Sequence, residues 1–162
     1  MKNTKNTTRK KLLSHLFMAG YPDEIFMPDE SITRAEVTVM FSRLITEKMD
    51  SNKDYSSSFP DVAEDSWYAP QLGFMEQYGI IEGYEDGSFR PYNAITRAEV
   101  ISIVNRMLER SCDKEYLENN PDEIKTYNDV TDEHWAYYDI TEASNAHLYQ
   151  KTPDEVWTEI AQ

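Results

Sequence analysis

The six-residue segment Ile-Thr-Arg-Ala-Glu-Val occurs twice in this chain, at residues 32–37 and at residues 95–100. The likeness extends upstream, because the pattern Gly-Tyr-x-Asp-x-x-Phe-x-Pro fills both 20–28 and 83–91 at the same offset of 63 (32 to 95). An internal repeat constrains the architecture strongly, since each copy is one structural unit that must bury its apolar face against a neighbour. The chain is therefore predicted to be built from related units.

Each copy of the six-residue segment predicts the start of a helix. Thr33 can serve as the N-cap and Glu36 as the N3 residue of a capping box, with Ile32 and Val37 as the hydrophobic staple. The second copy repeats all four residues within 95–100. Apolar residues continue at helical spacing, with Val37, Met40, Phe41, Leu44 and Ile45 in the first copy and Val100, Ile103, Val104, Met107 and Leu108 in the second. We expect two amphipathic helices of about four turns that pack through equivalent faces.

The arginines of the repeat have no evident part in starting these helices. Arg34 and Arg97 fall at the first helical position, where a cation is unfavourable by ~0.3–1 kcal/mol. A guanidinium beside free helix N-terminal amides can form an anion site. The alternative is a solvated arginine or a surface ion pair with one of the many carboxylates. Arg43 and Arg106 keep the same offset further along.

A second kind of element alternates with the first. Residues 59–62 (Phe-Pro-Asp-Val) precede Trp67-Tyr68, and residues 127–130 (Tyr-Asn-Asp-Val) precede Trp135-Ala136 at an offset of 68 (59 to 127). A helix is predicted to begin near each Trp. The expected N-caps are Asp65-Ser66 and Asp132, and the expected apolar faces are Leu72, Met75 and Ile80 in one copy and Ile140, Ala143 and Leu148 in the other.

Four residues predict a helix boundary or a turn between the first Trp and the second repeat copy. Pro70 is tolerable only in the first turn of its helix, and Gly79 is expected just after the last turn. Asp86-Gly87 predicts a tight, hairpin-like turn.

Composition excludes several classes of function. The formal net charge is −14, which disfavours general binding to nucleic acid or to an anionic membrane. No apolar run approaches the ~20 residues of a membrane span. Cys112 is the only cysteine, so no disulfide framework and no paired-thiol metal site is expected.

Nothing in the sequence marks a catalytic or metal site. His15, His134 and His147 have no ligand spacing and no nucleophile partner. The acidic stretches 61–65 and 129–133 lack the spacing and the loop glycine of an EF-hand. We predict no enzymatic activity, no catalytic residue, no metal and no cofactor.

The first residues form a basic leader, with Lys2, Lys5, Arg9, Lys10 and Lys11 ahead of a short apolar stretch. Ser14 and His15 interrupt that stretch, which favours a structural segment over a cleaved signal peptide. We expect residues 1–15 to be poorly ordered. An exported parent protein that has lost its signal remains an alternative.

Taken together, these residues resemble the S-layer homology (SLH) family. Its repeat runs from an aromatic-Pro-Asp-Val start through Trp-Ala or Trp-Tyr and Gly-Ile to Gly-Tyr-x-Asp-Gly-x-Phe-x-Pro and Ile-Thr-Arg-Ala-Glu. Residues 59–108 hold the whole pattern in order, 20–45 resemble the back half of a repeat, and 127–148 resemble the front half of another. The resemblance implies an all-α, pseudo-symmetric bundle of helical repeats joined by short loops or hairpin-like turns.

The resemblance also implies a function and a site. SLH repeats attach surface proteins non-covalently to anionic, often pyruvylated, secondary polysaccharides of the Gram-positive cell wall, in grooves between repeats. The implied ligand-binding residues are Arg34, Arg97, Asp61, Asp129, Trp67 and Trp135, to which we add Arg90, Gly83 and Tyr84 from the loop at 83–91, here called the second loop. The expected location is extracellular, at the cell wall or S-layer. The alternative function is a protein-interaction or assembly module that binds no carbohydrate.

The expected organisation is a leader at 1–15, the back half of a repeat at 16–50, a complete repeat at 54–112, and a front half with a C-terminal tail at 113–162. Half-repeats leave apolar faces without partners, so self-association is expected. We also expect Arg97 to contribute more to binding than Arg34, because Gly87 and Arg90 are replaced by Glu24 and Met27 in the first copy.

Overall fold

The computed structural model describes residues 18, 21, 24–50, 52–151 and 153–161. The predicted disorder of the leader at 1–15 falls outside these residues. The α-helices are α1 (Arg34–Leu44), α2 (Ala69–Gln77), α3 (Arg97–Met107), α4 (Lys114–Asn119) and α5 (Tyr137–Ser144). Two 3₁₀ turns, η2 (Thr46–Lys48) and η3 (Pro121–Glu123), and two strands, β1 (His147–Lys151) and β2 (Glu155–Ile160), complete the elements.

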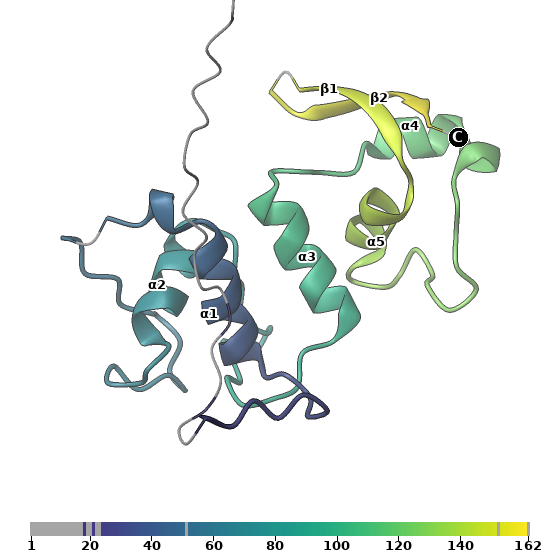
Figure 1. Ribbon diagram of the computed structural model, residues 1–162. Helices are drawn as coiled ribbons and strands as arrows, with labels where there is room; N and C mark the ends of the chain where they lie inside the picture. The colour runs from purple at the N-terminus through teal and green to yellow at the C-terminus, as the bar shows by residue number, and fades with distance from the viewer. Residues whose placement is uncertain (1–17, 19–20, 22–23, 51, 152, 162) are drawn as a thin grey trace, which may run out of the picture.

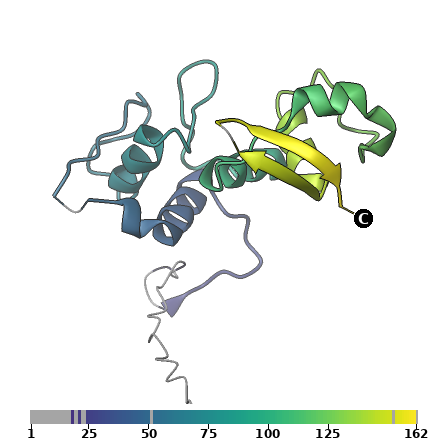
Figure 2. The ribbon, with the colours of Figure 1, turned by 90° about the horizontal axis from the view of Figure 1, so that it is seen from above.

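The helices pack in two pairs along the molecule. α1 lies against α2, and α3 lies against α5. α3 stands in the middle, with α1 and α2 on one side and α4, α5 and the hairpin on the other (Figures 1 and 2). β2 packs on α4 at the far end. In each pair a helix of the six-residue repeat therefore packs on a helix that follows a Trp. Within the described part of the chain, no helix is long and apolar enough to cross a membrane.

The two repeat helices begin where the sequence predicts. Thr33 and Thr96 are the N-caps, and both capping boxes are complete, with the N-cap amides donating to Glu36 and Glu99 at 2.8 and 2.7 Å. Each helix has 11 residues, about three turns rather than the four expected.

The predicted apolar stripes are buried or half-buried except at Leu44 and Leu108. Val37 and Phe41 on α1 and Ile103 on α3 belong to the core. Leu44 and Leu108 are 51% and 64% exposed, because each lies at the end of its helix where the chain turns away. The core gathers around α1 and α2 and also takes residues from α3 and the loops; it is formed by Ala35, Val37, Val39, Phe41, Tyr55, Tyr68, Leu72, Phe74, Met75, Ile80, Ile81, Phe89 and Ile103.

The helices after the tryptophans differ from the prediction at their starts. α2 begins after Tyr68 and α5 after Ala136, and neither N-cap residue makes a side-chain capping hydrogen bond. Asp65-Ser66 and Asp132 instead lie in turns ahead of the helices. Both helices are therefore held by packing rather than by the acidic caps that the sequence suggested.

Pro70 and Gly79 lie at the start and the end of α2, as the sequence predicts. Pro70 lies in its first turn. Gly79 follows the last turn with a φ of 66°, in the left-handed region that glycine enters without steric cost. The amides of Gly79 and Ile80 donate back to the carbonyls of Glu76 and Met75, both at 2.9 Å. This Schellman arrangement ends the helix and directs the chain into the second loop.

The all-α prediction is wrong at the C-terminus, where β1 and β2 form an antiparallel hairpin. The sequence predicts Leu148 on a helical face, but α5 ends at Ser144 and Leu148 lies in β1 with its side chain exposed. β2 alternates buried Glu155 and Trp157 with exposed neighbours, a period of two that only a strand satisfies. The described residues are thus mostly helical with one two-stranded sheet.

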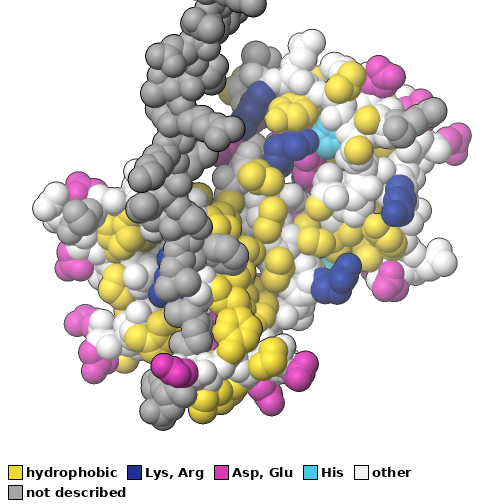
Figure 3. Space-filling model, viewed as in Figure 1, with side chains coloured by type: hydrophobic (Ala, Val, Ile, Leu, Met, Phe, Trp, Pro, Cys, Tyr) yellow, Lys and Arg dark blue, Asp and Glu magenta, His cyan; other side chains and the backbone are white. Residues whose placement is uncertain are grey.

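Hydrophobic side chains collect on the face shown in Figure 3. They form a band across the middle of the part not covered in grey, and most of the carboxylates visible there lie around its edge. An acidic surface surrounding an apolar band is consistent with the net charge of −14 and the 40% hydrophobic content.

Candidate functional site: two grooves beside the repeat helices

The N-terminus of α1 is hydrogen-bonded to the loop that precedes α3. Thr33 and Ala94 form an isolated antiparallel bridge. The amides of Arg34 and Ala35 donate to the carbonyls of Asn93 and Pro91, both at 2.9 Å. The sequence suggested that amides at this helix start would be free for an anion, and at α1 these two are not.

The larger groove, here called the Arg34 groove, lies beside α3 and has a volume of about 800 Å³. It is lined by Arg34, Ile81, Glu82, Gly83, Tyr84, Glu85, Asp86, Arg90, Thr96, Glu99, Ser102, Ile103, Arg106, Trp135 and Asp139. These residues come from α1, the second loop, α3 and the segment around α5. The groove is therefore a junction of several elements that lie far apart in sequence.

Arg34 crosses from α1 into this groove and is only 5% exposed. Its Nε donates to the Phe89 carbonyl at 2.8 Å, and its terminal nitrogens donate to Glu99 Oε1 at 2.7 Å and to the Glu82 carbonyl at 3.3 Å. The guanidinium carbon also lies 4.6 Å from the Tyr84 ring centroid and 4.7 Å from that of Phe89. Arg34 thus holds the second loop against α1.

Glu99 connects three parts of the groove. Its carboxylate closes the capping box of α3, pairs with Arg34 and accepts a hydrogen bond from the Tyr84 hydroxyl at 2.6 Å. Burial alone raises the pKa of Glu99, but the hydrogen bonds from Tyr84 and Thr96 and the Arg34 charge lower it below the usual value. Glu99 is therefore a carboxylate at neutral pH.

The second loop is shaped by its own side chains and by one carboxylate from outside. Asp61 accepts hydrogen bonds from the amides of Phe89 and Arg90 at 2.9 and 2.7 Å. Arg90 has a φ of 56°, which is unusual for a residue with a side chain, and these bonds stabilise that conformation. A Cβ on Gly83 would meet the Phe59 ring at 2.4 Å, so only glycine fits there.

Two further arginines in the groove form exposed ion pairs. Arg106 pairs with Glu82 at 2.6 Å, and Arg90 pairs with Asp86 at 2.7 Å. The two carboxylates are 66% and 56% exposed, in contrast to the enclosed Arg34–Glu99 pair. Trp135 forms part of the wall and is largely exposed.

The second groove, here called the Trp67 groove, lies beside α1 and has a volume of about 500 Å³. It is lined by Met18, Tyr21, Phe26, Met27, Pro28, Glu30, Ser31, Ile32, Glu36, Val39, Met40, Arg43 and Trp67. The Tyr21 hydroxyl donates to Glu36, the same contact that Tyr84 makes with Glu99 at an offset of 63 (21 to 84).

The structure distributes the predicted site residues unevenly. The Arg34 groove brings together Arg34, Gly83, Tyr84, Arg90 and Trp135. Trp67 lines the other groove, Asp61 supports the second loop from outside, and Arg97 and Asp129 are exposed and line neither groove. Arg106 and Glu99 were not among the predicted site residues, although the constant offset of Arg43 and Arg106 was the signal that could have pointed to Arg106.

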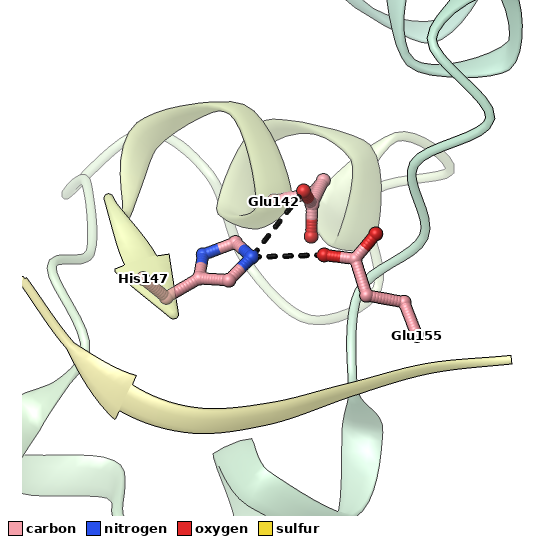
Figure 4. Close-up of side chains that lie close together, drawn as sticks. All are labelled: Glu142, His147 and Glu155. Atoms are coloured by element: carbon pink, nitrogen blue, oxygen red, sulfur yellow. Dashed lines mark hydrogen bonds and ion pairs between the residues drawn. The ribbon is translucent and has the colours of Figure 1, made fainter. Parts of the chain in front are cut away.

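A separate cluster lies at the C-terminal end of the molecule (Figure 4). Glu142, His147 and Glu155 each offer one ligand atom within 4.8 Å of the others. A terminal nitrogen of Arg110 lies 2.8 Å from an oxygen of each carboxylate and 2.7 Å from His147 Nε2. The guanidinium thus occupies the place that a metal ion would take, and the cluster serves to tie β1 and β2 to α5.

The nearby thiol is not activated. Burial first, and then the charges of Glu142 and Asp113, raise the pKa of Cys112 to about 12. A thiol with this pKa is protonated at neutral pH and is a poor nucleophile.

The comparison with protein families identifies the repeats. Residues 10–38 and 58–101 match the S-layer homology domain, and these two segments of the chain belong to that family. Such domains are non-catalytic anchoring modules of cell-surface proteins.

Several curated relatives share these segments. A cellulosome-anchoring protein of Acetivibrio thermocellus is 36% identical over 134 residues, covering 81% of this chain and 28% of that protein. A surface layer protein of Brevibacillus choshinensis is 30% identical over 102 residues, covering 62% of this chain and 10% of that protein. An amylopullulanase of Thermoanaerobacterium thermosulfurigenes is 32% identical over 147 residues, covering 90% and 8%. The chain therefore spans less than a third of the length of each of these relatives.

Proposed function

We propose that this chain anchors its protein to the cell wall, at the extracellular face of a Gram-positive cell, by binding an anionic, pyruvylated secondary cell wall polysaccharide in the Arg34 groove. The observation that carries the proposal is the meeting of three arginines, Arg34, Arg90 and Arg106, with the exposed face of Trp135 in one groove. The family membership supports the anchoring role, and the groove supplies the chemistry for an acidic sugar.

The charges of the groove favour exchange of one carboxylate for another. Every groove arginine is already paired, so a ligand carboxylate must replace a protein carboxylate. The Arg106–Glu82 and Arg90–Asp86 pairs are exposed, and exposed pairs contribute only about 0–1 kcal/mol. A ligand that combines a carboxylate with sugar-ring contacts can displace Glu82 at little cost, whereas Arg34 stays with Glu99.

The aromatic residues supply the remaining part of the proposed site. Trp135 presents an exposed indole face, as an apolar surface that a sugar ring can cover. Burial and the bond to Glu99 raise the pKa of Tyr84, which therefore remains a protonated hydroxyl that orients the Glu99 carboxylate. We expect the charged substituent of the polysaccharide to pair with Arg106 and a sugar ring to lie on Trp135.

Binding of purified wall polysaccharide by titration calorimetry tests the proposal. The polymer with its pyruvyl groups should bind, and the polymer stripped of them should bind more weakly. Arg106→Ala should lose about 1.5–3 kcal/mol of binding free energy, the range for hydrogen bonds to charged groups. Arg43→Ala is the matched control, because Arg43 occupies the corresponding position in the Trp67 groove.

Three outcomes would count against the proposal. Equal binding of the two polymers would remove the role of the pyruvyl carboxylate. Equal losses for Arg106→Ala and Arg43→Ala would remove the assignment to the Arg34 groove. Failure of the folded chain to bind any wall polysaccharide would favour the protein-interaction module instead.

A further inference from the structure

The residues that form the contacts of Arg34 correspond to exposed residues elsewhere in the chain. Tyr84 and Phe89, over which Arg34 lies, correspond at the offset of 63 to Tyr21 and Phe26. Phe89 is fully buried, whereas Tyr21 and Phe26 are 44% and 54% exposed. Two aromatic rings of one copy are thus open where those of the other are covered by a guanidinium.

The covering groups have exposed counterparts as well. Arg34 corresponds to Arg97, which is exposed on the surface. Asp61, which binds the amides of Phe89 and Arg90, corresponds at the offset of 68 (61 to 129) to Asp129, which is also exposed. Phe59, whose ring stacks on Phe89 with centroids 5.4 Å apart, corresponds to exposed Tyr127. The chain therefore carries both halves of a contact that it completes only once within the residues the structure describes.

The three covering groups lie on one surface. α3 packs on α5 as α1 packs on α2, so Arg97 at the start of α3 and Tyr127 ahead of α5 repeat the placement of Arg34 and Phe59. Asp129 follows Tyr127 by two residues. We call Arg97, Tyr127 and Asp129 the donor surface.

The receiving groups also lie together. Tyr21, Phe26, Met27 and Glu36 line the Trp67 groove, and we call them the acceptor surface. Met27 has a φ of 55°, close to the 56° of Arg90, so the backbone that Asp61 binds in one loop is present in the other. Glu36 is a carboxylate, because hydrogen bonds from Tyr21 and Thr33 outweigh the effect of burial and lower its pKa.

We propose that the acceptor surface binds the donor surface of a second copy of this chain. Arg97 of that copy would lie over Tyr21 and Phe26 and pair with Glu36, as Arg34 does with Tyr84, Phe89 and Glu99. Asp129 of that copy would accept hydrogen bonds from the amides of Phe26 and Met27, and the Tyr127 ring of that copy would stack on the Phe26 ring. The charges are complementary, because Arg97 of the second copy would face the Glu36 carboxylate in the Trp67 groove.

Light scattering and sedimentation equilibrium over a wide range of protein concentration test this proposal without any polysaccharide. The parent chain should show reversible, concentration-dependent association. Asp129→Ala and Phe26→Ala should each raise the dissociation constant about tenfold or more, because each removes charge-assisted hydrogen bonds or a ring contact. Both side chains are exposed, so circular dichroism should show folded proteins.

A mixture of the two variants and a control variant distinguish the proposed contact from nonspecific association. Asp129→Ala has an intact acceptor surface and Phe26→Ala an intact donor surface, so an equimolar mixture should associate more strongly than either variant alone. Asp132→Ala removes a neighbouring exposed carboxylate and should associate like the parent. A parent chain that stays monomeric at every concentration overturns the proposal, as does association that Asp129→Ala and Phe26→Ala leave unchanged. The result is independent of the wall-binding proposal, because no ligand is present.

Discussion

At the scale of single residues, two arginines with identical sequence neighbours have different environments. Arg34 and Arg97 both follow the N-cap of a capping box. Arg34 is buried and donates three hydrogen bonds, two to the carbonyls of Phe89 and Glu82 and one to Glu99 on α3. Arg97 is exposed. Sequence ranked Arg97 above Arg34 for binding, from the quality of the preceding loop. That ranking stays a prediction, and the structure adds that Arg34 is already occupied by the loop of the other repeat, whereas Arg97 lines neither groove.

The same contrast predicts their effects on stability. Arg34→Ala leaves the enclosed Glu99 carboxylate without its cation and should lower the free energy of unfolding by about 3–5 kcal/mol. Arg97→Ala should change the free energy of unfolding by no more than about 0.5 kcal/mol, because Arg97 is exposed and its removal breaks no buried contact. Urea unfolding at a concentration where the chain is monomeric measures both. Similar midpoints for the two variants would show that the Arg34 contacts contribute nothing.

At the scale of elements, the sequence predicted starts and turns better than it predicted the C-terminal segment. The capping boxes, Pro70 and Gly79 act through neighbours within a few residues, so their signals can be read locally. The hairpin depends on distant partners, because buried Glu155 is compensated by Arg110 from beyond α3. A buried carboxylate in a strand gives no local pattern until its cation is located.

Glu155 and Glu142 share Arg110 and His147 but should respond oppositely to neutralisation. Burial raises the pKa of both, yet the hydrogen bonds of Arg110 and His147 make the net shift of Glu155 downward. For Glu142 burial prevails over the His147 charge, and the Glu155 charge adds to it, so its pKa is raised. Glu155→Gln should cost about 1.5–3 kcal/mol of unfolding free energy at pH 7, while Glu142→Gln should be neutral or stabilising. Equal losses in urea unfolding would contradict this division.

At the scale of the whole molecule, the repeat predicted which residues are alike but not which ones meet. Five of the nine proposed ligand-binding residues come together in the Arg34 groove. The others are separated because the groove forms where α1 of one copy docks on the loop of the next, and a sequence offset carries no information on that docking. Asp61 illustrates the point, since its role in holding Phe89 and Arg90 depends on a contact across 28 residues of chain.

The carboxylates of the two grooves and of the C-terminal cluster predict how the whole fold responds to acid. The folded pKa values of Glu36, Glu99 and Glu155 lie below the usual 4.5. Each group therefore contributes stability that is fully present above about pH 4.5 and is lost as the pH falls through its lower folded pKa. Glu142 has a raised pKa and acts in the opposite sense, so its contribution is present below the unfolded pKa and is lost as the pH rises through the folded one.

Because three groups outweigh one, the melting temperature should stay nearly level from pH 7 to about pH 5 and fall steadily below that value. Calorimetry at a series of pH values measures this dependence, at a protein concentration that keeps the chain monomeric. Glu99→Gln should begin from a lower melting temperature and show a shallower decline in acid, because one of the three linked protonations has been removed. A melting temperature that is constant down to pH 3, or a Glu99→Gln profile parallel to that of the parent, would show that the Arg34–Glu99–Tyr84 contact does not stabilise the fold as its geometry indicates.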